Sequence, residues 1–189
     1  MPLLPPNAVL LVIDVQQGFN DPSWGQRNNP QAEENIAKLL EAWRRTDHPI
    51  IHLQHLSKEE HSLLRADNPG SQFKEQAQPQ THELIIQKSV NSAFIGTHLE
   101  QILHTHHFDT LVIVGLTTDH CVSTTTRMAG NLGFQTYVVS DATATFERVG
   151  YDGRNYTAQE IHDVSLVSLN HEFATVVDTH SVIEMLSDR

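Results

Sequence analysis

Short apolar runs rich in β-branched residues recur along this chain, and most intervals between them carry apolar residues at helical spacing. The runs "AVLLVID" (8–14) and "TLVIVG" (110–115) are typical of strands that are buried on both faces. Strands that alternate with helices build a mainly parallel sheet with helices on both sides. We therefore expect an α/β fold with six strands, at residues 8–14, 49–54, 83–88, 110–115, 136–141 and 174–178.

Helical patterns fill most of the intervals between these strands. Pro30 fits the first turn of a helix, and Gly133 fits the position just after a last turn. We see no internal repeat and no low-complexity tract. The expected helices cover residues 30–45, 96–107, 121–133, 158–173 and 181–186.

Length and charge narrow the class of protein. With 189 residues, the chain suits one domain with a sizeable core, which we expect to span residues 1–189. Lys and Arg number 12 against 23 Asp and Glu, giving a formal net charge of −11. Because the basic residues form no cluster that could follow phosphates, we expect no nucleic-acid partner.

The chain contains a single cysteine, Cys121, which cannot form an internal disulfide. The amino terminus carries no basic segment and no small-residue cleavage site, as a secretion signal would. No apolar run approaches the ~20 residues that cross a bilayer. These features predict a soluble protein of the reducing cytoplasm, without a membrane partner.

One polar segment breaks the alternation. Residues 56–82 contain Asn-Pro-Gly and Pro79, and they form a longer connection than most α/β domains have. The composition fits a site-shaping loop, a disordered flap or a tolerated surface insertion. Together with residues 20–30 this segment would shape the substrate site, but neither stretch carries a decodable signature.

Three side chains that could take part in catalysis lie at or just after the ends of apolar runs. Asp14 ends the first run, Lys88 ends the third, and Cys121 follows the fourth by a short turn. Ligand sites in open parallel sheets form beyond the carboxyl ends of the strands. An acid, a cation and a thiol therefore converge on one edge if their strands are neighbours.

The chemistry gives each of these side chains a role. A thiol with a pKa near ~8.5 becomes more nucleophilic beside a helix amino terminus, a cation or a base, and the sequence offers Cys121 all three. Asp14 would take the thiol proton and pass it to a leaving amine, and Lys88 would favour the charged forms. Backbone N–H groups at the helix start would hold an oxyanion. The structural alternatives are a small core residue at Cys121, a turn cap at Asp14 and a solvated strand end at Lys88.

Three segments resemble the isochorismatase-like cysteine hydrolase superfamily. "DVQQGF" (14–19) is similar to its opening D-x-Q-x-x-F, and "KSVNSAFIGTHLEQIL" (88–103) is similar to its lysine segment. "VGLTTDHCVSTTTRMAGNLGFQTYVVSDATAT" (114–145) resembles its G-x-x-T-D-x-C-V stretch and the strand beyond. The match runs from about residue 8 to the end of the chain in the same order and spacing.

This resemblance implies a fold and a catalytic site. The fold would be a three-layer α/β/α Rossmann-like sandwich with a mainly parallel six-stranded sheet. The family's catalytic triad carries over to Asp14, Lys88 and Cys121. The resemblance also implies a cis peptide bond between Leu116 and Thr117, with the N–H groups of Thr117 and Cys121 forming the oxyanion hole.

The resemblance further implies a substrate pocket and an assembly. Gln16, Phe19, Trp24 and Phe94 lie on segments that usually line the family's pocket, although core packing also fits Phe94. We expect a small-molecule substrate, a homo-oligomer of two or more copies and no cofactor. The lack of a G-x-G-x-x-G or P-loop pattern agrees with the last expectation.

The family divides by chemistry. Members that hydrolyse the vinyl ether of isochorismate can lack the cysteine, whereas members that attack amides, ureides or carbamoyl groups through a thioester need it. The presence of Cys121 therefore favours C–N hydrolysis through a covalent thioester. Two alternatives stay open: an isochorismate-type vinyl ether hydrolase with Asp14 as the acid, and a non-catalytic family member that acts as a binding protein.

The segment at the end of the second expected strand lacks a metal motif that some relatives would carry there. Nicotinamidases of this family carry Asp-x-His after the second strand, where this chain reads "IIHLQHLS". No Asp precedes His52 at that spacing, and a pair such as His52 and His55 without a nearby carboxylate is more typical of surface or pocket residues. We predict no required metal.

Four further features have ordinary structural interpretations. The histidines of residues 104–107 should face solvent at a helix end. Arg127 either binds a substrate carboxylate or pairs with a surface acid, and we favour the surface pair. Asp119 is expected to cap the helix of the nucleophile, and Asp141 to be a turn residue at a strand end.

Overall fold

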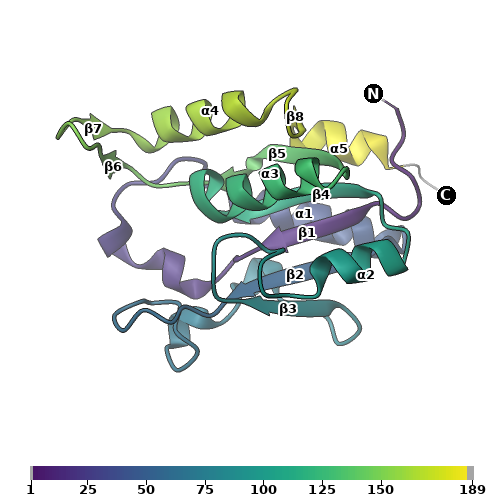
Figure 1. The fold of residues 1–189 in the computed structure, drawn as a ribbon, viewed down its shortest axis with the longest axis horizontal. Coiled ribbons are helices and arrows are strands. Elements are labelled where there is room, and N and C mark those ends of the chain that lie inside the picture. Colours follow the sequence, from purple (N-terminus) through teal and green to yellow (C-terminus); the bar gives the residue numbers. More distant parts are fainter. Residues whose placement is uncertain (1, 187–189) are drawn as a thin grey trace.

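The computed structural model describes residues 2–186, and its central feature is one sheet of six parallel strands (Figure 1). Every pair of neighbouring strands in this sheet is parallel. The strands lie in the order β3-β2-β1-β4-β5-β8. Their bounds are β1 (Val9–Ile13), β2 (Ile50–His55), β3 (Leu84–Lys88), β4 (Thr110–Leu116), β5 (Gln135–Ala144) and β8 (Thr175–Val177).

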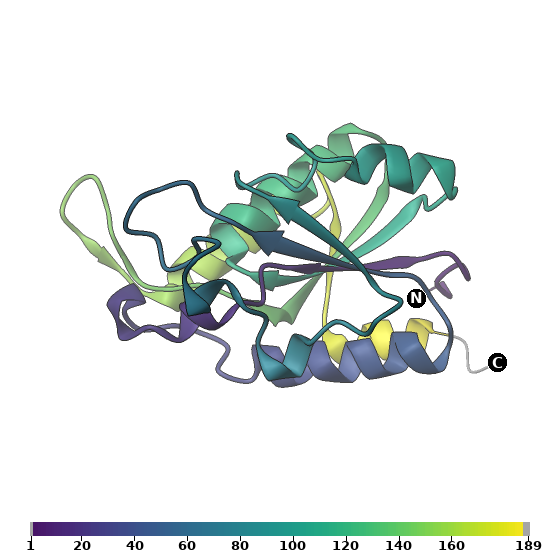
Figure 2. The ribbon, with the colours of Figure 1, turned by 90° about the horizontal axis from the view of Figure 1, so that it is seen from below.

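Helices cover both faces of the sheet (Figure 2). One face carries α1 (Ala32–Arg45) and α5 (Thr179–Met185), and the other carries α2 (Leu99–Thr105), α3 (Ser123–Asn131) and α4 (Ala158–Leu169). A short antiparallel hairpin, β6 (Arg148–Val149) and β7 (Asn155–Tyr156), precedes α4. The expected three-layer α/β/α sandwich with a Rossmann-like parallel sheet is confirmed.

The two apolar cores follow from the period of two along a strand. On β1, Leu10 and Val12 pack in the core under α1 and α5. Leu11 and Ile13 point the other way and pack in the core under α2, α3 and α4. Because both faces are covered, the central strands are apolar throughout, which is why they appear as continuous apolar runs.

The six strands and five helices expected from the sequence are all present, with ends that differ by at most four residues. One expectation about a strand end is wrong. β5 continues to Ala144, so Asp141 lies inside the strand rather than in a turn. Its carboxylate accepts hydrogen bonds from the backbone N–H and the hydroxyl of Thr179, and this contact ties α5 to the sheet.

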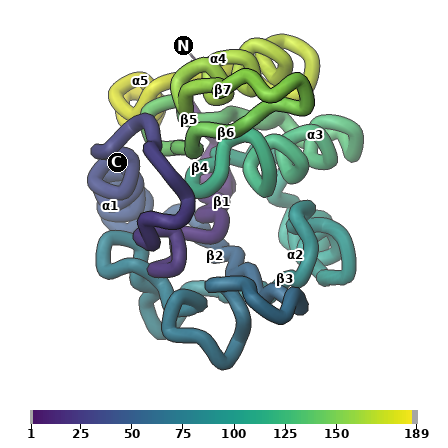
Figure 3. The backbone as a smooth tube through the Cα atoms, turned by 90° about the vertical axis from the view of Figure 1, so that its left-hand side faces the viewer, coloured from purple at the N-terminus to yellow at the C-terminus, as the bar shows by residue number. Residues whose placement is uncertain are grey.

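The chain changes direction between β1 and β4. From β1 it proceeds outward through β2 to β3, and it then returns to place β4 on the other side of β1. Figure 3 looks on to the edge where the carboxyl ends of these strands lie. Gly115 on β4 lies opposite Ile13 with a φ of +121°, and a Cβ there would stand 2.0 Å from the Ile13 carbonyl oxygen. Only glycine allows β4 to approach β1 this closely.

The segment 56–82 packs against the body of the protein, so the expectation of a disordered flap is wrong. It contains the single-turn helices η3 (Pro69–Ser71) and η4 (Glu75–Ala77). Phe73 pairs with Gln16 in an isolated β-bridge, and Lys74 forms a buried ion pair with Glu33 at 2.6 Å. These contacts attach the segment to the chain just after β1 and to α1.

Every helix among residues 2–186 is too short or too polar to cross a bilayer.

Candidate active site

Asp14 follows the last residue of β1 and is fully buried. Its φ of +51° lies in the left-handed region, which a non-glycine residue adopts only when the surrounding structure holds it there. The Asp14 Oδ2 atom lies 2.6 Å from the Lys88 Nζ. The other oxygen, Oδ1, is buried and has no hydrogen-bond partner among the described residues. The carboxylate therefore has one oxygen engaged and one free to accept a proton.

Lys88 ends β3, and its side chain is also fully buried. Besides Asp14, its ammonium contacts the His55 Nδ1 at 3.1 Å and donates to the Val90 carbonyl oxygen at 3.2 Å. An ammonium has three N–H donors, so all three are used. His55 reaches Lys88 because β2 lies between β1 and β3, and the register pairs His55 with Lys88.

Cys121 lies in a short π-helix, η5 (Thr118–Val122), that follows β4 and leads into α3. Its side chain is 7% exposed. The thiol donates a weak hydrogen bond to the Asn91 Oδ1 at 3.7 Å. Cys121 Sγ, one carboxylate oxygen of Asp14 and one ring nitrogen of His55 all lie within 4.8 Å of one another. The expected convergence of acid, cation and thiol is therefore present at the carboxyl edge of the sheet.

The surroundings of the Cys121 thiol favour its protonated form at rest. Burial and the negative charge of Asp14 raise the pKa of the Cys121 thiol, and the Lys88 ammonium only partly opposes them. In addition, α3 begins two residues later at Ser123, so Cys121 is not the first residue of that helix. The resting thiol is therefore protonated at neutral pH, and a base must remove its proton as it attacks.

We expect alkylation of Cys121 by iodoacetamide to be slow at neutral pH and to rise above pH ~8.5, the ordinary thiol pKa. Asp14→Asn removes the negative charge and should shift the rate profile to lower pH. Intact mass gives a direct readout because the chain has one cysteine. A wild-type profile that stays fast well below pH ~7 would contradict the raised pKa.

The turn that links β4 to Cys121 contains the cis peptide bond that the resemblance implies. The peptide bond between Leu116 and Thr117 is cis. Within the described part of the chain, the backbone N–H of Thr117 has no hydrogen-bond partner. Thr117 is buried and precedes Cys121 by four residues, so this N–H is a candidate donor for an oxyanion.

Two of the expected pocket residues have structural contacts. Gln16 is fully buried, and its side-chain amide bonds to the backbone N–H and carbonyl of His55 and to the Ser71 carbonyl. Phe94 is buried in the core and stacks on Phe134, with ring centroids 6.0 Å apart. These contacts give both side chains a structural role, and their contact with a substrate stays a prediction.

The other two expected pocket residues lie in an aromatic cluster at the carboxyl edge. Phe19, Trp24 and Phe146 have ring centroids between 5.1 and 6.2 Å apart. They pack with Leu64 of segment 56–82 and with Leu116, the residue before the cis peptide bond. Phe19 is buried and Trp24 is partly exposed, so Trp24 is the member of the cluster with surface available.

Asp119 and Arg127 differ from expectation. Asp119 does not cap a helix; its carboxylate accepts from the Thr145 hydroxyl and from the Arg148 Nε at 2.7 Å. It thereby ties η5 to the chain beyond β5. Arg127 donates to the hydroxyls of Ser123 and Ser168 and does not pair with a described acid. The exposed histidines of residues 104–107 lie at the end of α2, as expected.

The donor atoms of Asp14, His55 and Cys121 are close enough to hold a metal ion. The Lys88 ammonium, however, lies 2.6 Å from the Asp14 Oδ2 and 3.1 Å from the His55 Nδ1, where it acts as an internal cation. His52 lies elsewhere, because its Nε2 contacts the Glu83 Oε2 at 2.8 Å. The two histidines therefore do not share a site.

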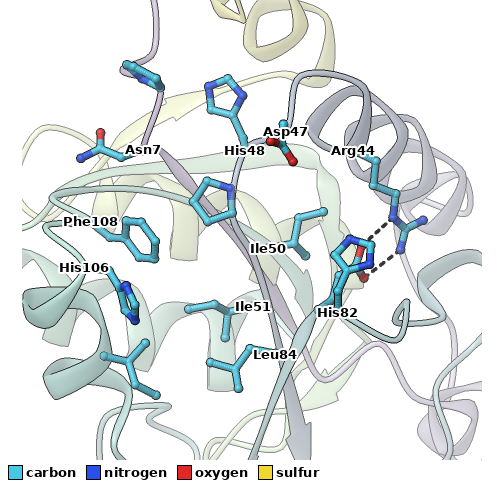
Figure 4. Close-up of a pocket in the computed structure, with 14 residues that line it drawn as sticks. Asn7, Arg44, Asp47, His48, Ile50, Ile51, His82, Leu84, His106 and Phe108 are labelled. Carbon is cyan, nitrogen blue, oxygen red and sulfur yellow. Dashed lines mark hydrogen bonds and ion pairs between the residues drawn. The ribbon is translucent and has the colours of Figure 1, made fainter.

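A hollow of about 520 Å³ lies at the opposite edge of the sheet, by the amino ends of β2 and β3 (Figure 4). Its walls include Ile50, Leu84 and Phe108, and the Arg44 and Glu83 side chains form an ion pair there. The length of β2, at ~3.3 Å per residue, separates this hollow from the triad. It is therefore not the reaction site.

Glu83, which lines this hollow, makes the stability of the protein depend on pH. Burial alone would raise its pKa, but hydrogen bonds from Arg44, the Gln80 N–H and His52 lower the pKa of Glu83 to about 2. Because the pKa of Glu83 is lowered in the folded state, its ionised carboxylate stabilises the fold at pH values above the ordinary glutamate pKa near 4.5. This stabilisation is lost as the pH falls from 4.5 toward 2. By urea unfolding, Glu83→Gln should cost up to about 3 kcal/mol at pH 7, and this difference should shrink in that window. A pH-independent difference would contradict the assignment.

The fold and the site together define a class of protein: an open α/β/α sandwich with acid, lysine and cysteine side chains beyond the carboxyl ends of its central strands. The isochorismatase domain family matches residues 8–181. This chain belongs to that family, which is hydrolytic.

Individual relatives agree with this assignment. The uncharacterised isochorismatase family protein YrdC of Bacillus subtilis is 51% identical over 174 residues, covering 92% of this chain and 93% of that protein. A solved structure of an isochorismatase family protein from Chromobacterium violaceum superposes with a TM-score of 0.95 at 41% identity, covering 98% of this chain and 96% of that one.

More distant relatives carry activity names. Nicotinamidase 3 of Arabidopsis thaliana is 28% identical over 184 residues, covering 90% of this chain and 84% of that protein. N-carbamoylsarcosine amidase of an Arthrobacter species is 29% identical over 123 residues, covering 65% of this chain and 42% of that protein.

Proposed function

We propose that this protein is a cysteine-dependent hydrolase that cleaves the C–N bond of a small amide, ureide or carbamoyl substrate through a covalent thioester. The observation that carries the proposal is the closeness of the Cys121 Sγ to a carboxylate oxygen of Asp14, within 4.8 Å. The unpartnered Asp14 Oδ1 supplies the lone pair that a thiol proton needs.

In the first half of the reaction, Asp14 takes the thiol proton while the Cys121 Sγ attacks the carbonyl carbon and a C–S bond forms. The free N–H of Thr117 and the N–H of Cys121 stabilise the oxyanion. The C–N bond then breaks, and Asp14 returns the proton to the leaving nitrogen. The products of this half are ammonia or an amine and a thioester on Cys121.

In the second half, water attacks the thioester carbon and Asp14 takes the proton of the water. The C–S bond breaks, the acid product leaves, and the proton returns to the sulfur. Lys88 balances the charge of Asp14, because its ammonium lies 2.6 Å from the carboxylate. The cycle needs no second co-reactant besides water.

The comparisons support C–N hydrolysis over ether hydrolysis. The nicotinamidase and the N-carbamoylsarcosine amidase are named for reactions at an amide and a carbamoyl group, and both resemble this chain. The thiol also favours this reaction, because a thioester route requires the cysteine and protonation of a vinyl ether does not.

The test is ammonia release from nicotinamide, N-carbamoylsarcosine and acetylurea, with pyruvate release from isochorismate measured in parallel. We expect ammonia release from at least one amide-type substrate and a near-complete loss in Asp14→Asn, the variant without the base. Pyruvate release that survives Cys121→Ala would instead establish ether hydrolysis. A folded protein that converts none of the four compounds would favour the binding-protein alternative.

We expect activity without a bound metal ion. Dialysis against EDTA should leave ammonia release unchanged, because Lys88 already occupies the space between the Asp14 and His55 donor atoms. Metal content measured by plasma emission gives the control. Activity that disappears with EDTA and returns on addition of Zn²⁺ would overturn this prediction.

A further inference from the structure

We propose that His55 is a substrate-binding residue of this site, a neutral imidazole whose Nε2–H donates a hydrogen bond to an acceptor oxygen next to the carbon that Cys121 attacks. The inference rests on the proposed function and adds a substrate class to it. The preferred substrates would carry a carboxylate or second carbonyl oxygen beside the scissile group.

The tautomer of His55 follows from its contact with Lys88. The His55 Nδ1 lies 3.1 Å from the Lys88 Nζ, and an ammonium can only donate. The Nδ1 must therefore accept, so it carries the lone pair. In a neutral imidazole the hydrogen is then on the Nε2. Lys88 thus determines which nitrogen of His55 is a donor.

Burial and the Lys88 ammonium favour the neutral form of His55. Both lower the pKa of the imidazole, and the Asp14 and Glu59 carboxylates, which raise it, do not cancel the effect. The imidazole is therefore a donor of fixed direction at neutral pH and not a competing cation.

Hydrogen bonds with the Gln16 side chain fix the backbone of His55. The side-chain amide of Gln16 accepts from the His55 N–H at 2.8 Å and donates to the His55 carbonyl at 3.0 Å. Because Gln16 is fully buried, this clamp positions the end of β2. Gln16, one of the expected pocket residues, thus positions His55.

The remaining nitrogen is the one that a substrate can reach. The Nε2 of His55 has no hydrogen-bond partner within residues 2–186, and it is not among the buried atoms that lack one. The His55 side chain is 13% exposed, whereas those of Asp14 and Lys88 are 0% exposed. A ring nitrogen of His55 also lies within 4.8 Å of the Cys121 Sγ. Of Asp14, Lys88 and His55, it is therefore His55 that can face an incoming molecule.

Two substitutions separate the functions of the two ring nitrogens. His55→Asn places an amide near the position of Nδ1, where its oxygen can still accept from Lys88, but it leaves no donor at the Nε2 position. His55→Gln extends an amide N–H to the Nε2 position. Both substitutions keep the site charge unchanged, since the imidazole is neutral.

The experiment compares the alkylation rates of Cys121 by iodoacetamide, which carries a carbonyl oxygen beside the reacting carbon, and by iodoethane, which carries none, at an alkaline pH where the wild-type thiol reacts. The ratio of the iodoacetamide rate to the iodoethane rate cancels the intrinsic reactivity of the thiol and reports how the site treats an acceptor oxygen beside the reacting carbon. We expect the ratio to fall at least about fivefold in His55→Asn and to stay within about twofold of wild type in His55→Gln.

An unchanged ratio in His55→Asn, with Cys121 still reactive, would overturn the inference and leave the proposed function intact. An equal fall in both variants would also overturn it, because it would assign His55 a purely structural role. If the proposed function itself were wrong, the result would be another one: ammonia release would persist in Cys121→Ala, or the wild-type thiol would react with neither reagent.

Discussion

Cys121→Ala is expected to lower ammonia release by about 10⁴-fold or more, because it removes the atom that forms the thioester. The remaining groups still orient the substrate but cannot form the covalent intermediate. The substitution removes one sulfur atom from a side chain that packs in the core under α2, α3 and α4, so the fold should survive. A coupled ammonia assay gives the rate, and circular dichroism verifies the fold.

Cys121→Ser is the matched control for shape. A hydroxyl occupies nearly the same space and can donate the same hydrogen bond to the Asn91 Oδ1, but it is far less acidic than a thiol. We expect it to be nearly as inactive as the alanine variant. Substantial ammonia release from either variant would exclude a covalent route through Cys121.

Lys88→Met is expected to destabilise the protein by about 3–5 kcal/mol, because it leaves the buried Asp14 carboxylate without its cation. The pair is fully buried, so solvent cannot compensate for the loss. Combining Lys88→Met with Asp14→Asn should recover a large part of this free energy, since the remaining charge is removed as well. Urea unfolding of the single and double variants measures the coupling.

The surface pair Arg65–Asp67 provides the control. Its N–O distance of 2.8 Å is similar, but its side chains are 38% and 68% exposed. Arg65→Met should change the free energy of unfolding by less than about 1 kcal/mol. If Lys88→Met cost no more than this, or if the Asp14 and Lys88 effects were simply additive, the buried pair would not act as a unit.

The strands and helices were predictable because their signals are local. Two-sided burial of β1 and β4 requires every position to be apolar, and the amphipathic period of α1 is visible over a single segment. The positions of Asp14, Lys88 and Cys121 followed from the same signals, since each stands where an apolar run ends. β5 was expected too short because Ser140 and Asp141 end its apolar run, although the strand continues and pairs with β4 as far as Ala144.

His55 and Asn91 show what the sequence argument missed. His55 ends β2, so the rule that identified Asp14 and Lys88 applies to it as well, but on the sequence alone it stayed a surface or pocket residue without a role. Asn91 lies three residues after Lys88, and nothing in its type or spacing indicates that its amide would meet the Cys121 thiol. Both depend on which strands are neighbours and on how far a loop folds back.

Hydrophobic period and strand ends are properties of short segments, so the sequence alone could predict the layered α/β architecture. For the same reason it could place Asp14, Lys88 and Cys121, the proposed catalytic residues, at one edge of the sheet. Only the tertiary structure decided the state of those residues. It buries the thiol beside Asp14, which raises its pKa, and it directs the amide of Gln16 to the His55 backbone. Burial and charge depend on distances between segments that are far apart in the chain, and the order β3-β2-β1-β4 sets those distances.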